Sequence, residues 1–88
     1  MDIFQAVDAK DASLVEMLST DVNKTDSDGN TPLHYAAMKN AVDVMKVLLR
    51  HGANPFKKNR RGSTPLDVSY IYDSDLPLYV KTCERGNK

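Results

Sequence analysis

The sequence has little of what several large classes of protein require. Cys83 is the only cysteine, which excludes an intramolecular disulfide and a cysteine-rich zinc site and agrees with a reducing compartment. No apolar run approaches the roughly 20 residues needed to span a membrane, and the first residues have neither the basic region nor the apolar core of a signal peptide. We therefore expect no membrane segment and an intracellular protein, cytoplasmic with the nucleus as an alternative.

The chain is also short. Its 88 residues are near the lower end of what folds alone, so that roughly 60 to 65% of the unfolded surface can be buried. A core of that size leaves little room for a deep active-site cavity. Hydrophobic residues make up 41% and charged residues 27%, which is ordinary globular usage and predicts a soluble, folded domain.

The net charge is zero, but the charges are unevenly distributed. Residues 1–45 hold 3 basic and 8 acidic side chains, whereas residues 46–88 hold 9 basic and 4 acidic ones. Such an asymmetry concerns association rather than fold. It predicts a partner that meets surfaces of opposite sign.

One segment of the chain recurs. Asp28–His34, with the sequence DGNTPLH, reappears as Arg61–Asp67, RGSTPLD, at an offset of 33 residues. The same offset pairs Asp26 with Asn59 and Val47 with Val80. Several matches at one spacing indicate an internal structural repeat.

The repeated residues mark the starts of helices. A threonine hydroxyl is a good N-cap, and Thr31 and Thr64 are each followed by a proline at the first helical position, where no amide hydrogen is needed. Gly29 and Gly62 lie just upstream among polar residues, which is typical of a tight turn with a positive φ angle. A hairpin turn is therefore predicted before each helix.

Two helices follow the first hairpin. We expect a short one over 33–38, ended by Asn40, and a second over 42–51 with apolar residues at helical spacing, ended by Gly52. Alone, such a unit cannot bury its apolar stripe. It is expected to stack on copies of itself.

The two ends of the chain look like incomplete repeats. Residues 1–20 match the two predicted helices at an offset of 30, with a shortened connection through Ser19 and Thr20. Lys81 and Thr82 take the places of two leucines, which is typical of a terminal cap. We predict one domain over 1–88, made of an N-terminal capping helix pair (1–20), a central repeat (21–53) and a C-terminal capping repeat (54–88).

The repeated unit resembles the ankyrin repeat, which has a 33-residue period and a Thr-Pro-Leu-His-x-Ala core. The core here reads TPLHYAA over 31–37, with GANP at 52–55. Departures are Asp67 for the usual His, Ser69 for the usual Ala, and the segment 76–78. The resemblance implies an all-α ankyrin-repeat solenoid of about three stacked helix pairs with short β-hairpin connections.

The resemblance also implies a function. Ankyrin repeats bind proteins through their hairpin tips and the exposed side of the first helix of each pair, so we expect a monomeric protein-interaction module, an adaptor, scaffold or inhibitor, that is not an enzyme and needs no cofactor or metal. The matching positions here are Thr25, Ser27, Asp28, Asn30, Met38, Lys39, Lys58, Arg60, Arg61, Ser63, Ile71 and Tyr72. Because the period places both tips on one side, the acidic tip (Asp26 and Asp28) is expected beside the basic tip (Lys58, Arg60 and Arg61).

Other interpretations remain open. The basic run Lys57–Arg61 could contact nucleic acid, although the balanced charge and the single nearby aromatic, Phe56, favour an acidic protein partner or a solvated loop. The chain could also be a targeting segment of a larger signalling protein. Ser63 follows two arginines as in a basophilic kinase site, although an unmodified turn serine is the simpler interpretation.

Two site types are disfavoured by the pattern. His34 has no clustered partner, so a structural role near its helix start is expected rather than metal binding or catalysis. The run 26–29 alternates acids before a glycine, but a calcium loop in that register would place Lys24 first and Tyr35 twelfth. A hairpin turn fits better.

Overall fold

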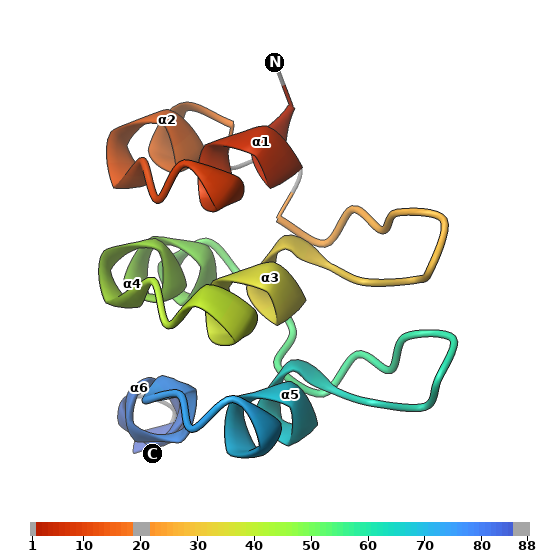
Figure 1. Ribbon diagram of the computed structural model, residues 1–88. Coiled ribbons are helices and arrows are strands. Elements are labelled where there is room, and N and C mark those ends of the chain that lie inside the picture. Colours follow the sequence, from red (N-terminus) through yellow and green to blue (C-terminus); the bar gives the residue numbers. More distant parts are fainter. Residues whose placement is uncertain (1, 19–21, 86–88) are drawn as a thin grey trace.

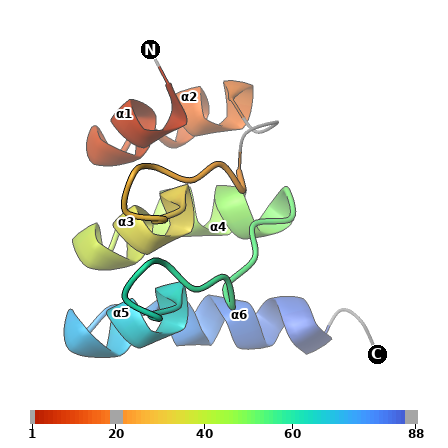
Figure 2. The ribbon, with the colours of Figure 1, turned by 90° about the vertical axis from the view of Figure 1, so that its right-hand side faces the viewer.

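The computed structural model describes residues 2–18 and 22–85, with side chains as far as Val80. Its helices are α1 (Ile3–Asp8), α2 (Ala12–Met17), α3 (Pro32–Lys39), α4 (Val42–Arg50), α5 (Pro65–Ile71) and α6 (Leu76–Arg85). They form three stacked pairs, with α1, α3 and α5 in one row, α2, α4 and α6 in another, and two long loops projecting from the same side (Figure 1). The first and last pairs lie at opposite ends of the stack (Figure 2).

The central pair is packed on both sides. α3 contacts α1 and α5, while α4 contacts α2 and α6. Leu33, Met45 and Leu48 are fully buried, as are Ala36 and Ala37, whose small side chains let neighbouring helices approach closely. The apolar stripe that one pair cannot cover alone is therefore covered by its neighbours, and the predicted stack of three helix pairs is confirmed.

The predicted helix starts are confirmed, and the structure explains why aspartate at position 67 can replace the usual histidine of the motif. The Thr31 hydroxyl accepts a hydrogen bond from the His34 amide (3.4 Å), and His34 Nδ1 accepts one from the Thr31 amide (2.9 Å). Thr64 and Asp67 repeat this exchange at 3.1 and 3.0 Å. Asp67 thus replaces a histidine without loss of the reciprocal cap.

A left-handed residue follows the first helix of each pair, with φ angles of 56° at Lys10, 49° at Asn40 and 54° at Asp73. Asn40 is itself the C-cap of α3, whereas Lys10 and Asp73 come directly after the C-caps of α1 and α5. Asn40 also links two pairs, since its Oδ1 accepts hydrogen bonds from the Asp75 amide (3.2 Å) and the Ser74 hydroxyl (3.3 Å). Asn40 therefore ends α3 as predicted, although the helix reaches one residue further. α4 ends one residue earlier than predicted, at Arg50.

The β-hairpin connections differ from the prediction, because the described residues contain no strand. The first loop is closed instead by hydrogen bonds within its tip, from the Asp26 amide to the Asn30 carbonyl and from the Gly29 amide to the Asp26 carbonyl, both 3.0 Å. So short a turn leaves no room for a ladder of strand pairs. The Ser19–Thr20 connection and the side chains of Lys81 and Thr82 lie outside the described residues.

The cap at α5 leads to a stability test. Thr64→Val removes the hydroxyl that accepts from the Asp67 amide while keeping the side-chain shape, so we expect a loss of about 1 kcal/mol in unfolding free energy. Urea denaturation followed by circular dichroism measures it. Thr25→Val, the same change at an exposed position, is the control, and equal stability of the two variants would contradict the capping role.

Candidate functional site

Each loop is organised by one side chain at its base. Asp26 Oδ1 accepts hydrogen bonds from the amides of Asp28 (3.0 Å) and Asn30 (2.9 Å). Asn59 Oδ1, one repeat later, accepts from the amides of Arg61 (2.9 Å) and Ser63 (3.0 Å). Both tips are therefore held by the same kind of side-chain turn, which fixes where the exposed tip residues point.

Three hydrogen bonds join the first loop and α3 to the second loop. The Arg60 amide donates to the Asp28 carbonyl (3.0 Å), Asn59 Nδ2 to Asn30 Oδ1 (2.8 Å), and His34 Nε2 to the Ser63 carbonyl (2.9 Å). The two loops therefore form one continuous surface.

Gly29 makes this close approach sterically feasible. Its φ angle is 76°, and a Cβ atom there would lie only 3.0 Å from the Arg60 amide nitrogen. Any larger residue would be strained by its own backbone and would also push the second loop away.

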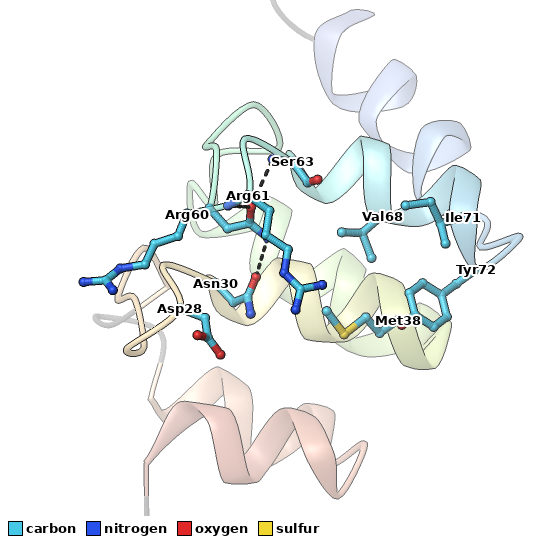
Figure 3. A pocket seen from close by; sticks show the side chains of 10 residues that line it. Asp28, Asn30, Met38, Arg60, Arg61, Ser63, Val68, Ile71 and Tyr72 are labelled. Carbon is cyan, nitrogen blue, oxygen red and sulfur yellow. Dashed lines mark hydrogen bonds between the residues drawn. The ribbon is translucent and has the colours of Figure 1, made fainter.

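Between the loops and helices α3 and α5 lies a cleft of about 360 Å³. Its loop side is polar and charged, and its helix side is apolar (Figure 3). The residues that line this cleft are Asp28, Asn30, Met38, Asn59, Arg60, Arg61, Ser63, Val68, Ile71 and Tyr72.

Most residues predicted for the site are brought together by this cleft. The exceptions are Thr25, Ser27, Lys39 and Lys58, which do not line it; Lys39 Nζ instead pairs with Asp8 Oδ1 at 2.8 Å. Sequence reasoning missed Asn59 and Val68. The offset that pairs Asn59 with Asp26 was a usable signal for Asn59, whereas nothing local distinguished the buried Val68 from a core residue.

The two tips lie side by side, as the period predicts, but in the described part of the chain no ion pair joins them. The Asp26 carboxylate is turned inward and accepts a hydrogen bond from the Tyr35 hydroxyl. Burial raises its pKa, but the bonds from Tyr35 and the Asn30 and Asp28 amides outweigh this and hold the pKa below its usual value. The same bond to Asp26 raises the pKa of Tyr35. Asp26 is therefore part of the scaffold, and the basic tip keeps its charge unpaired.

His34 is a structural residue. Its side chain is fully buried, and since Nδ1 accepts from the Thr31 amide, the proton lies on Nε2, which donates to the Ser63 carbonyl. Burial lowers the pKa of His34, while the Ser63 carbonyl and the nearby charge of Asp26 act in the opposite sense and are outweighed. In the described part of the chain, no three His, Cys, Asp or Glu side chains come together as metal ligands.

A family model described as ankyrin repeats, in three copies, matches residues 3–79. The chain belongs to the ankyrin repeat family. Ankyrin repeats are protein–protein interaction modules, and the all-α ankyrin solenoid is also the fold of the Bcl-3 ankyrin repeat domain, a member of the IκB family. That structure matches with a TM-score of 0.71 and 28% identity, over 81% of this chain and 34% of the other.

Curated relatives are much longer than this ankyrin-repeat chain. Ankyrin repeat protein OPG189 of monkeypox virus is 35% identical over 85% of the chain and 14% of its own length. The human 2-5A-dependent ribonuclease is 36% identical over 82% of the chain and 10% of its own length. The similarity therefore concerns a small part of each relative. Among the described residues of this chain, no helix is long and apolar enough to cross a membrane.

The buried neutral His34 predicts a pH dependence of stability. Because the folded-state pKa lies below the ordinary value of about 6.5, the unfolded state binds the proton first as pH falls. Stability should be fully present above about pH 6.5 and decline as pH falls through the folded-state pKa. Unfolding free energies between pH 5 and 7.5 test this, and His34→Gln should remove most of the decline. An equal decline in the variant would show that a group other than His34 causes the pH dependence.

The close approach at Gly29 gives a matched pair of variants. Gly29→Ala and Gly62→Ala place an alanine at nearly equal positive φ angles, 76° and 79°, but only the first meets a neighbouring backbone. We expect both to be destabilised by about 1 kcal/mol or more, and Gly29→Ala to be the worse. Thermal denaturation measures the difference. Equal losses would mean that the loops do not approach as closely as described.

Proposed function

We propose that this chain binds another protein in the cleft between the two loops and helices α3 and α5, as an adaptor, scaffold or inhibitor and without catalysis. The proposal is based on one observation: the side chains that hold the scaffold together differ from the side chains that line the cleft. The side chains of the helix-capping threonines and of His34 turn inward to cap helices and join repeats. The side chains of Asp28, Arg61 and Tyr72 line the cleft instead, and among the described residues they form no hydrogen bond or ion pair that would tie them to the scaffold.

The exposed apolar residues at the C-terminal end of α5 support this proposal. Ile71 is 72% exposed and Tyr72 is 54% exposed, and both line the cleft beside the half-buried Met38. Neighbouring exposed apolar side chains mark interaction surfaces more often than single ones do, and methionine and tyrosine are enriched in protein interfaces. A partner side chain seated there would remove this apolar surface from water.

The proposal also includes the oligomeric state, the cellular compartment and the predicted site residues that do not line the cleft. We infer a monomer that works in the cytoplasm or nucleus, in agreement with the single cysteine. The small share of each relative that the chain matches is compatible with the alternative that it is a targeting segment of a larger signalling protein. Thr25, Ser27, Lys39 and Lys58 would then contact the partner at the margin of the cleft.

Nucleic acid is the second candidate ligand, since the run Lys57–Arg61 has no acidic partner within the described residues. Asp28 lines the same cleft, and Asp2, the N-cap of α1, adds negative charge on the same row of helices, whereas Asp8 is paired with Lys39. A polyphosphate backbone would meet these charges unfavourably. Nucleic-acid binding would also fall steeply with salt and tolerate many sequences.

Two double variants test the placement of the binding face. Ile71→Ala with Tyr72→Ala removes the exposed apolar wall, and we expect partner dissociation at least about tenfold faster, because buried aromatic and aliphatic anchors dominate interface energy. Asp43→Ala with Arg50→Ala changes exposed residues of α4 on the other row of helices and is the control. Partners captured by affinity purification are then compared by biolayer interferometry, with thermal melts to verify folding. Loss of binding in the control alone would place the interface on the back of the stack.

A further inference from the structure

Arg61 places a cation at the cleft from a backbone position that a hydrogen bond holds in place. Its amide is held by Asn59 Oδ1 at 2.9 Å, and its side chain reaches from the loop toward Met38, whereas Arg60 extends away from the cleft (Figure 3). In the part of the chain that the structure describes, the guanidinium forms no ion pair. A guanidinium presents a planar fork of donors that matches a carboxylate.

The wall opposite Arg61 is apolar and small. Met38, Val68, Ile71 and Tyr72 line it, and only Val68 among them is buried. The volume of about 360 Å³ lies at the lower end of pockets that bind small molecules. It suits one or two side chains of a partner, with an apolar group against the wall and a carboxylate at Arg61.

The charge at the other end of the same face limits how much negative charge a partner can carry. A second hollow of about 320 Å³ between α1 and α3 is lined by Asp2, Asp8 and Asp26, together with Phe4 and Tyr35. Asp8 is paired with Lys39, so the unpaired negative charge of this hollow comes from Asp2 and Asp26. That charge repels a polyanion that extends along the row of helices, but an isolated carboxylate at Arg61 lies away from it. An acidic side chain in a protein segment therefore fits the face better than a nucleic-acid strand does.

We propose that the partner presents a short segment in which an acidic side chain lies close to an apolar one. The carboxylate pairs with Arg61, and the apolar side chain packs against Met38, Ile71 and Tyr72. This inference rests on the proposed function, and it adds the chemistry that the partner must display. It also assigns different roles to two neighbouring arginines, since Arg60 contributes its backbone amide to the loop contact and Arg61 its side chain to the partner.

Peptide selection tests the inference without a known partner. Random twelve-residue peptides displayed on phage are selected on the folded chain, and enriched sequences are synthesised for fluorescence polarisation. We expect enriched peptides to carry Asp or Glu within about four residues of Leu, Ile, Met or Phe. Replacing that acid by its amide should weaken binding about tenfold, because a charge-assisted pair is lost.

Variants of the chain identify the group that receives the acid. Arg61→Ala should weaken the acidic peptide about tenfold and affect its amide version much less, and Arg61→Lys should retain part of the affinity. Lys57→Ala removes the same charge from an exposed position of the same loop outside the cleft, and it should cost less than about threefold. Thermal melts show whether each variant is folded.

The possible results separate this inference from the proposed function. Peptides that depend on Ile71 and Tyr72 but are indifferent to Arg61, or that are basic, overturn the inference and leave the cleft as the binding site. Peptides whose affinity is unchanged by substitutions at Arg61, Ile71 and Tyr72 overturn both the inference and the proposed function. Enrichment of no peptide contradicts recognition of a short segment, and tighter binding of a twelve-nucleotide oligothymidine than of any peptide at 150 mM salt would favour nucleic acid instead.

Discussion

The hydrogen bond from His34 Nε2 to the Ser63 carbonyl sets the relation between one repeat and the next. The donor is a fully buried side chain of α3, and the acceptor is a backbone carbonyl of the following loop. The bond therefore holds the second loop against helix α3 as well as against the first loop. Both ring nitrogens are used, because Nδ1 caps the helix on which the residue lies. A single neutral imidazole thereby joins a local signal, the helix start, to a non-local one, the stacking of repeats.

The last described repeat lacks this connection. Asp67 occupies the position of His34 and reproduces its cap, but an ionised carboxylate has no hydrogen to donate to a further loop. Tyr70, one repeat after the buried Ala37, is 72% exposed. A large side chain can stand there because no described helix packs on that side of α5, whereas at Ala37 it would force α3 and α5 apart.

The cleft is formed by these same constraints. Since Asn59 turns its loop and also donates to Asn30, the tip that carries Arg60 and Arg61 is held beside the first loop and in front of α5. One wall is then polar and has a hydrogen-bonded backbone, and the other is apolar and partly exposed. This combination supports recognition by a few fixed polar contacts around an apolar anchor, which needs less ordering on binding than a flexible loop would.

The sequence by itself determined the features that depend on neighbours a few residues apart. Thr31 and Thr64 with their prolines mark helix starts, and Gly29 and Gly62 mark turns, because caps and positive φ angles are local properties of the chain. The 33-residue offset marks the repeat, and it too can be read from the sequence alone. Only the tertiary structure decided which of two identical, neighbouring side chains is part of the scaffold and which faces the cleft. Asp26 and Asp28 look alike in sequence, yet the carboxylate of Asp26 is bound by Tyr35 and its own loop, and of two adjacent arginines only Arg61 reaches over the apolar wall (Figure 3). Val68 could not be assigned to the cleft either, since a buried valine becomes part of a site only when a loop from the same repeat and a helix from the preceding one enclose a space above it.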